Sequence, residues 1–327
     1  ETLIGVYGAS IDENEAFLYM AGHFHKCGLP VPEVRIVSED KTYYLQEDLG
    51  DTLLFHAIEK GRATSVFSEE EKELLRKTIR LLPAIQFAGA DGFDFSRCYP
   101  QPEFNQRSIL WDLNYFKYCF LKATGMEFQE DKLEDDFQKM SDVLLRSSSA
   151  TFMYRDFQSR NVMIKDGEPW FIDFQGGRKG PFYYDIASFL WQAKAKYPDS
   201  LRKELLQEYM EALRKYQPID ESYFYSQLRH FVLFRTLQVL GAYGFRGYFE
   251  KKPHFIQSVP YAIENLRELL KEEYPEYPYP EVIGYVNNDD GTLTLKVQAV
   301  FPYRGVSKAY IHEVTVRDTK DGGIQYV

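Results

Sequence analysis

A short β-hairpin with oxygen-bearing side chains around its open end constrains this chain more than any other feature. The stretch is YRDFQSRNVMIKDGEPWFIDFQGG, residues 154–177. VMIK and PWFI are apolar runs of strand length, and the DG pair between them is a strong signal for a hairpin turn. Counted outward from Gly167, Asn161 lies six residues before it and Asp173 six residues after it. A symmetric register predicts that these two residues face each other where the strands end, with Asp156 one short loop away.

Three side chains that converge in this way suit phosphoryl transfer. Its transition state needs positioning and charge neutralisation: a carboxylate accepts the proton of the attacking hydroxyl, and Asn and Asp hold Mg²⁺ on the nucleotide phosphates. Mg²⁺ prefers oxygen ligands and keeps several waters, so two protein ligands are enough. The spacing D-x-x-x-x-N followed by D-F is typical of the catalytic and metal-binding loops of kinases. An isolated D-x-x-x-x-N also arises in ordinary turns, but the hairpin and the second aspartate favour the catalytic interpretation.

Length, charge and cysteine content narrow the class of protein. A chain of 327 residues can bury a full core and allows about two domains. Its net charge of −10 disfavours a general nucleic-acid binder, which needs a basic surface. The three cysteines are odd in number and widely spaced, which argues against a disulfide framework or a zinc site. No apolar run approaches the ~18–20 residues of a membrane span. We therefore expect a cytoplasmic protein that binds neither nucleic acid nor membranes.

The order of strand-like and helical segments predicts an α+β chain with two lobes. Residues 1–50 form a small mixed unit, and residues 51–272 are mainly helical around the hairpin. Ser68 followed by Glu71 is a capping-box signal at the head of one long helix. A strand-first lobe followed by a helical lobe is an α+β arrangement. Residues 273–327 form a third part, a Pro/Tyr-rich linker and a β-rich tail.

The linker EYPEYPYPEV (273–282) is expected to interrupt regular structure. Beyond it, TLTLKVQAVFPYRG and KAYIHEVTVRD are expected to pair as strands. No function is assigned to this tail. Earlier in the chain, YFYSQLRHFVLFRTLQVLGAYGF is apolar nearly all round and predicts a buried helix.

The segments YRDFQSRN and WFIDFQGGRKGPFYYDIASFL resemble the aminoglycoside phosphotransferase-like kinases, a branch of the protein-kinase-like fold that includes choline, aminoglycoside and sugar kinases. The resemblance covers about residues 1–272. It is closest to the anomeric N-acetylmuramate/N-acetylglucosamine kinases of cell-wall recycling, through IDFQ followed by GPFYYD, WDLNYFKYCFL and LFRTLQVLGAYGF. It implies a two-lobed protein-kinase-like fold whose N-lobe lacks its first strands, followed by a small C-terminal β-rich segment.

The resemblance also implies roles for residues around the hairpin. Asp156 becomes the catalytic base, and Asn161 and Asp173 become the ligands of Mg²⁺, with ATP as the nucleotide. Tyr154 stands where the family usually has His, and its ring can fill the same packing role in support of the site. Asp185 matches a family aspartate that supports the catalytic loop; it could equally be the N-cap of the following helix.

Four residues of YYLQEDLG resemble the hinge between the lobes, where backbone groups would contact adenine: Gln46, Glu47, Asp48 and Leu49. The alternative is an edge strand that enters a loop. The chain shows no G-x-G-x-x-G phosphate loop and no Lys in the strand where kinases place one. We expect these first strands and their loop to precede Glu1. Phosphate neutralisation would then fall to Mg²⁺ and to Arg178 or Lys179, which could instead be solvated loop charges.

The substrate must place one hydroxyl within reach of Asp156, in a pocket that the helical lobe is expected to shape. Five polar residues of the helical lobe are candidates for contact with it: Asp112, Ser159, Arg160, Arg235 and Gln238. Each could equally be a buried partner between helices. A cationic aminoglycoside would require a cluster of carboxylates, whereas the helix around Asp112 is rich in aromatic residues that suit a neutral or anionic sugar.

We therefore expect an ATP- and Mg²⁺-dependent phosphotransferase that acts on a small-molecule hydroxyl, the anomeric hydroxyl of an N-acetylated amino sugar. One alternative is an aminoglycoside or choline-type kinase. Another is a non-catalytic pseudokinase that binds nucleotide or a partner, against which the complete set of Asp156, Asn161 and Asp173 argues. The exact sugar, the phosphate donor and the oligomeric state stay open.

Overall fold

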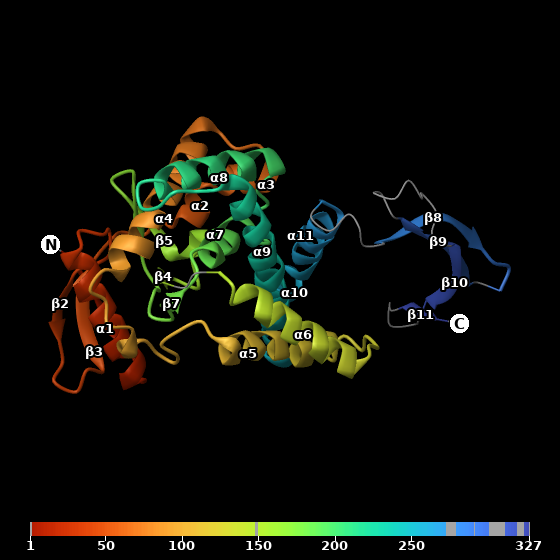
Figure 1. The fold of residues 1–327 in the computed structure, drawn as a ribbon, viewed down its shortest axis with the longest axis horizontal. Coiled ribbons are helices and arrows are strands. Elements are labelled where there is room, and N and C mark those ends of the chain that lie inside the picture. The colour runs from red at the N-terminus through yellow and green to blue at the C-terminus, as the bar shows by residue number, and fades with distance from the viewer. Residues whose placement is uncertain are drawn as a thin grey trace. The chain divides into compact units, whose positions relative to one another are not determined.

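A computed structural model describes residues 2–147, 150–272, 279–290, 292–300, 311–318 and 324–326 (Figure 1). The chain divides into two compact units, Glu1–Ile263 and Glu264–Val327. Within the described residues, no helix combines the length and the apolar character needed to cross a membrane.

A three-stranded antiparallel sheet opens the first unit, in the order β1-β3-β2. Its strands are β1 (Leu3–Tyr7), β2 (Val34–Val37) and β3 (Tyr43–Glu47). Helix α1 (Ile11–Lys26) connects β1 to β2 and begins after Ser10, whose side chain accepts a hydrogen bond from the Glu13 N–H. Because β3 is the central strand, the alternative that made its end an edge strand is wrong.

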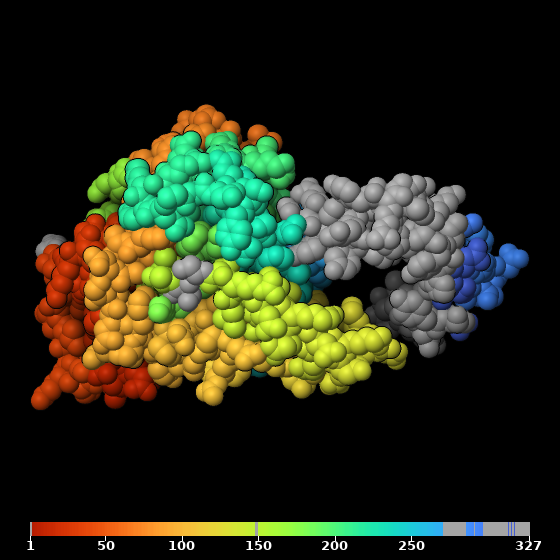
Figure 2. All heavy atoms as spheres, in the orientation of Figure 1, coloured from red at the N-terminus to blue at the C-terminus, as the bar shows by residue number. Residues whose placement is uncertain are grey.

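Helices make up most of the remainder of the first unit (Figure 1). They are α2 (Leu54–Ala57), α3 (Glu59–Thr64), α4 (Glu69–Phe87), α5 (Gln106–Phe116), α6 (Glu130–Leu144), α7 (Tyr183–Leu190), α8 (Asp199–Leu213), α9 (Glu221–Gly244), α10 (Pro253–Ile256) and α11 (Val259–Glu272), which runs on into the second unit. The predicted capping box at the start of α4 is confirmed, because Ser68 and Glu71 each bond to the other's backbone N–H. On one face, α8 covers the upper part of the first unit and α5 and α6 the lower part (Figure 2).

Helix α9 is the centre of the helical lobe and packs against α5, α6 and α7. Two of its glycines allow close approach to α5 and to the π-helical turn Lys117–Leu121 that follows α5. A Cβ atom on Gly241 would lie 2.8 Å from the backbone nitrogen of Phe116, and one on Gly244 would lie 2.0 Å from the carbonyl oxygen of Cys119. Larger residues there would separate the two backbones. The prediction of a buried helix is confirmed.

Two pairs of short strands lie between the sheet and the helices. Strand β4 (Thr151–Met153) pairs with β7 (Arg178–Gly180), and β5 (Val162–Lys165) pairs with β6 (Glu168–Phe171). The second pair is the predicted hairpin.

The hairpin turn consists of two residues, Asp166 and Gly167. Both have positive φ, 53° and 76°, as the type I′ turn favoured in two-residue hairpins requires. Lys165 therefore pairs with Glu168. The centre of symmetry lies between Asp166 and Gly167, and not on Gly167.

This turn shifts the open end of the hairpin by one residue. Ile172 lies opposite Asn161, and its N–H donates to the Asn161 carbonyl oxygen at 3.1 Å. The predicted pairing of Asn161 with Asp173 is therefore wrong by one residue.

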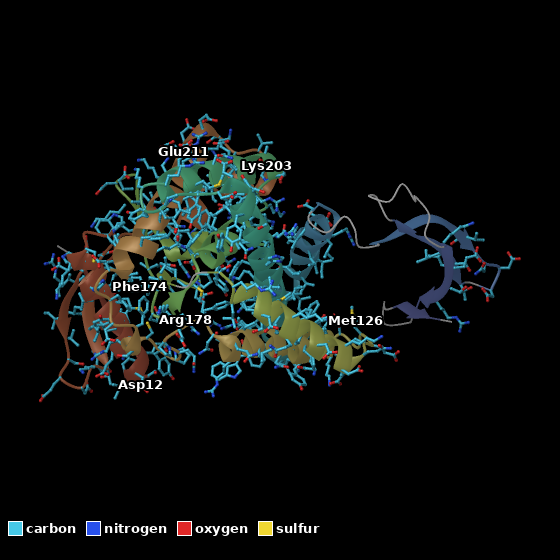
Figure 3. All side chains as sticks on the ribbon, in the orientation of Figure 1. Asp12, Met126, Phe174, Arg178, Lys203 and Glu211 are labelled. Atoms are coloured by element: carbon cyan, nitrogen blue, oxygen red, sulfur yellow. The ribbon has the colours of Figure 1, made fainter. Side chains whose placement is uncertain are left out.

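Stacked and edge-on aromatic rings join the sheet to the end of the hairpin. Phe17 of α1 stacks on Tyr44 of β3 and on Phe174, with centroid distances of 5.0 and 5.2 Å. Phe24, about two turns further along the same face of α1, meets Phe174 and Phe152 edge-on, with centroid distances of 5.3 and 4.9 Å. Phe174 is fully buried (Figure 3). The residue that follows Asp173 is thus fixed by α1.

The second unit contains a four-stranded antiparallel sheet in the order β11-β10-β9-β8. Its strands are β8 (Tyr279–Asn287), β9 (Leu293–Val300), β10 (Ile311–Asp318) and β11 (Ile324–Tyr326). The predicted pairing of the two tail segments is confirmed by β9 and β10. Residues 273–278 of the predicted linker lie outside the described residues. The prediction that residues 279–282 interrupt regular structure is wrong, because β8 begins at Tyr279. As an outer strand of the sheet, β8 tolerates Pro280.

Replacement of Phe24 by Ala tests the aromatic contacts between α1 and the hairpin. The side chain is 1% exposed, and its removal leaves a cavity among rings that cannot close up. We expect the free energy of unfolding to fall by about 3–5 kcal/mol, measured by urea denaturation. Val66→Ala is the control, because Val66 is 75% exposed. Equal, small losses in both variants would contradict the packing described.

Candidate active site

One buried carboxylate holds the loop that carries Asp156. Asp185, in the first turn of α7, is fully buried. Its Oδ2 atom accepts hydrogen bonds from the Tyr154 N–H and from Gln86 Nε2, both at 3.0 Å, and its Oδ1 atom accepts one from the Arg155 N–H at 2.9 Å. Arg155 has a positive φ of 75°, a conformation that side chains other than Gly adopt only when their surroundings hold them there. Asp185 supplies that restraint directly before Asp156.

The alternative role for Asp185, as the N-cap of α7, is wrong. The N-cap position is Phe182, and it makes no side-chain capping bond. Burial raises the pKa of Asp185 to about 6, although the hydrogen bonds from Gln86 and from the backbone of Tyr154 and Arg155 lower it.

Tyr154 links the same loop to the end of the hairpin. Its hydroxyl donates to the carbonyl oxygen of Ile172, one residue before Asp173. The ring is 1% exposed and meets Phe157 and Phe174 edge-on, with centroid distances of 5.3 and 6.3 Å. The tyrosine therefore fills a packing position and adds a bond between the two loops of the site.

The carboxylate of Asp156 is half-exposed and faces a buried arginine. Arg235 of α9 places its Nη2 atom 3.3 Å from Asp156 Oδ1. Its Nε atom donates to Ser188 Oγ at 3.1 Å, and its Nη1 atom donates to Gln238. These contacts anchor the guanidinium between α7 and α9, so that Arg235 orients Asp156 from the helical lobe.

Asn161 and Asp173 come together despite the shifted register. Asn161 Nδ2 donates to the Asp156 carbonyl oxygen at 2.8 Å, which leaves its own side-chain oxygen as an acceptor. Side chains alternate between the faces of a strand, so an extended Asp173 would point away from Asn161. Asp173 lies two residues after the end of β6, and its left-handed backbone, with φ of 65°, breaks this alternation.

The Asp173 carboxylate lies in an environment suited to a cation. Burial of the carboxyl group raises its pKa, and the charge of Asp156 raises it further, whereas hydrogen bonds from Gln175 and Asn161 lower it. A bound cation would offset the effects of burial and of the nearby negative charge, which raise the pKa.

A second group of charges lies beneath the loop. Arg155 Nη2 is 3.0 Å from Asp112 Oδ1, and Asp112 is buried. Arg178 is only 2% exposed (Figure 3), so the alternative that made it a solvated loop charge is wrong. Its guanidinium donates to the Gly176 carbonyl oxygen at 3.2 Å. Burial, and then Arg155, lower the pKa of Arg178 to about 10.

A cavity of about 440 Å³ opens at the loop that carries Asp156. Six of the residues singled out from the sequence line it: Asp156, Arg160, Asn161, Asp173, Arg235 and Gln238. Two other substrate candidates do not. Asp112 pairs with Arg155, and the buried hydroxyl of Ser159 donates to Gln192 Oε1 at 2.7 Å.

The predicted hinge residues lie outside the lining of this cavity, against the hairpin. Glu47 Oε1 accepts a bond from Lys165 Nζ at 2.6 Å, and Leu49 is buried. An adenine-binding role for them stays a prediction.

Sequence reasoning missed part of the cavity wall, which consists of aromatic and cationic side chains: Phe55, Tyr115, Trp191, Lys194, Tyr243, Arg246, His254 and Phe255. The segment WQAKAK after α7 offered one signal, since it places cations directly after a buried helix. The others come from segments far apart in the sequence, and only the fold brings them together.

Replacement of Asp185 by Asn tests the buried carboxylate through the pH dependence of stability. Its pKa rises from the ordinary 3.8 to about 6 on folding, so between these values the folded protein holds a proton that the unfolded chain has lost. The free energy of unfolding should therefore fall by about 3 kcal/mol as the pH rises through this window. Asp185→Asn should lose this part of the dependence, measured by urea denaturation across the window. The exposed control Asp135→Asn should retain it, and a wild-type slope in Asp185→Asn would refute the assignment.

Comparison with known proteins places this geometry in a family. A model described as a phosphotransferase enzyme family matches residues 8–219, and a second model, described as a family of unknown function, matches residues 255–327. The chain is 27% identical over 250 residues to an N-acetylmuramate/N-acetylglucosamine kinase of Neisseria meningitidis. The aligned region covers 74% of this chain and 71% of that protein. It is 25% identical over 252 residues to the protein of the same name from Pseudomonas aeruginosa, with 75% and 70% covered.

The fold is also that of solved kinases. A choline kinase from Cryptosporidium parvum superimposes with a TM-score of 0.57 at 13% identity, over 83% of each chain. The predicted two-lobed α+β fold of this group is confirmed. The match over residues 8–219 covers more than half of the chain, which therefore belongs to the phosphotransferase enzyme family and is a small-molecule kinase.

Proposed function

We propose that this kinase transfers the γ-phosphoryl group of ATP to the anomeric hydroxyl of an N-acetylated amino sugar. The charge of the cavity wall is the observation that carries the proposal. Its carboxylates are Asp156 and Asp173, both of which the reaction requires, and it holds more cations than carboxylates: Arg160, Lys194, Arg235 and Arg246. A cationic aminoglycoside or choline would meet like charge there, whereas a neutral or anionic sugar would not.

The aromatic part of the wall supports a sugar as well. Tyr115, Trp191, Tyr243 and Phe255 present ring faces or edges to a polar cavity of a size that suits a small ligand. Such rings pack on the apolar face of a sugar while nearby polar groups bond to its hydroxyls. The relatives from Neisseria and Pseudomonas are named for two N-acetylated amino sugars.

Asn161 and Asp173 fit a magnesium ion. Both provide oxygen donors, and Mg²⁺ completes its shell with waters and substrate phosphates when the protein supplies one or two ligands. Among the described residues, no cluster of three or more acidic, His or Cys side chains offers another site. Bound there, the ion would neutralise charge on the phosphates. Its removal by a chelator is therefore expected to stop turnover.

In the proposed reaction, Asp156 accepts the proton of the sugar hydroxyl as the oxygen of that hydroxyl bonds to the γ-phosphorus. The bond from phosphorus to the bridging oxygen breaks, and ADP leaves with the electron pair. Arg235 holds Asp156 from α9, and Asp185 holds the backbone directly before it. Both residues thus serve to position the proton acceptor.

Asp156→Asn tests the proton acceptor. The amide has the same shape but cannot take the proton, so kcat should fall by about 10²- to 10⁴-fold while the melting temperature stays near that of the wild type. Turnover is measured as ADP release with Mg²⁺. Asp135→Asn on α6 makes the same chemical change at an exposed site and should leave kcat unchanged. A wild-type rate in Asp156→Asn would refute the role.

The substrate class is tested with a panel of N-acetylmuramate, N-acetylglucosamine, glucosamine, kanamycin and choline. Turnover should be confined to the N-acetylated sugars and absent in Asp156→Asn. The position of the new phosphate follows from loss of the reducing-end signals in the NMR spectrum of the product. Turnover of kanamycin or choline alone would replace this proposal with the aminoglycoside or choline-type alternative.

A further inference from the structure

Two guanidinium groups lie against one aromatic ring at the edge of the cavity. The ring belongs to Phe55 of α2, and its centroid is 3.4 Å from Cζ of Arg62 and 4.5 Å from Cζ of Arg160. Arg62 Nε also donates to the Phe55 carbonyl oxygen at 2.9 Å. Arg62 is thus held in place by protein, whereas Arg160 is exposed to solvent. Like charges so close repel each other unless something offsets them.

Lys194 adds a third cation to this pair. It lines the catalytic cavity and also a second cavity of about 500 Å³, to which Arg62 and Lys196 contribute as well. Burial lowers the pKa of Lys194, and the charges of Arg160 and then Arg62 lower it further. The positive charges of Lys194, Arg160 and Arg62 therefore repel one another.

The described residues supply little negative charge to balance the cluster of Arg62, Arg160 and Lys194. Glu59 is the one carboxylate among the described residues that line the second cavity, and it acts on Arg62. Within the described part of the chain, Lys194 forms no hydrogen bond or ion pair. Packing on Phe55 accounts for the position of Arg62. It does not account for the ammonium group of Lys194 near the guanidinium groups of Arg62 and Arg160. An anion in this position would relieve the repulsion.

The placement of the cluster favours the acceptor over the nucleotide as the source of that anion. Arg160 directly precedes Asn161 in the short turn Ser159–Asn161, so the cluster is tied to the catalytic loop. The wall of the catalytic cavity comes from the helical lobe and the loop, and none of the described residues of β1–β3 or α1 contributes to it.

We propose that Arg160 and Lys194, supported by Arg62, form a subsite that binds a carboxylate on the acceptor sugar, so that an acidic N-acetylated amino sugar is phosphorylated in preference to its neutral counterpart. The inference rests on the proposed function, since it concerns the same acceptor in the same cavity. The N-acetyl sugar that carries a carboxylate is N-acetylmuramate, and its neutral counterpart is N-acetylglucosamine. The subsite is a determinant of specificity and takes no part in proton transfer.

The test compares kcat/KM for the two sugars in the wild type and in Lys194→Met. Loss of one charge-assisted contact should lower the ratio of acidic to neutral sugar by about 10- to 100-fold, through KM for N-acetylmuramate. Lys194→Arg should restore most of the ratio. Arg160→Gln should lower it as well, which provides a second variant if Lys194→Met is poorly folded. Lys132→Met removes the same charge from the exposed face of α6 and should keep the wild-type ratio.

The methyl ester of N-acetylmuramate provides a matched substrate, because it keeps the shape and loses the charge. The wild type should lose on the ester at least the factor that Lys194→Met loses on the acid, because the ester weakens the contacts of both Lys194 and Arg160, and the two losses together should be far from additive. Additive losses would overturn the subsite, as would an unchanged ratio in both Lys194→Met and Arg160→Gln.

Two further outcomes separate the possible errors. A rise in KM for ATP, with the sugar ratio unchanged, would assign the cluster to the nucleotide phosphates and overturn the subsite alone. Failure of the wild type to phosphorylate either sugar would overturn the proposed function and the subsite with it.

Discussion

The hydrogen bonds that Asp185 accepts from two successive backbone N–H groups are the interaction on which the site depends. They fix the peptide units of Tyr154 and Arg155, and thereby the direction in which the chain enters Asp156. Arg155, in its left-handed conformation, turns its side chain to Asp112 beneath the loop. A carboxylate can accept both bonds at once through its two oxygens, which explains why an acidic residue occupies a fully buried position. Gln86, bonded in turn by the Tyr209 hydroxyl, extends the arrangement from α7 to α4 and α8.

The same loop is coupled to the sheet by aromatic contacts. Tyr154 bonds to the backbone just before Asp173 and packs on Phe174, while Phe174 stacks on Phe17 of α1. The proposed proton acceptor and the proposed metal ligand are therefore parts of one packed structure that reaches from α7 to β3. Such a structure limits the motion of both carboxylates relative to each other, and phosphoryl transfer depends on that geometry more than on any single bond.

Sequence patterns predicted the local features of this protein well. The hairpin, the capping box at Ser68 and the buried helix α9 follow from periodicity and turn chemistry, which are local properties. The register of the hairpin was wrong by one residue, because the prediction counted from Gly167, whereas the two-residue turn that an Asp-Gly pair favours is centred between its two residues. Spacing also cannot tell a solvated arginine from a buried one, as Arg178 demonstrates. The aromatic and cationic remainder of the cavity wall was not predicted, since Phe55, Lys194 and Arg246 come from distant segments that line one cavity only in the folded chain.

The glycines of α9 have a consequence for how specificity can evolve in this protein. Because α9 touches α5 and the following π-helical turn backbone to backbone at Gly241 and Gly244, no side chain lies between these elements there to absorb a change in size. A substitution that moves α9 would also move the anchor of Asp156. Residues of the loop after α7 differ in this respect: Gln192 is bonded to Ser159 of the loop that carries Asp156, whereas Lys194 forms no such bond among the described residues. The proposed proton acceptor is thus anchored by α9, which tolerates little change, whereas the proposed acceptor subsite draws on Lys194, whose exchange would leave that anchor in place.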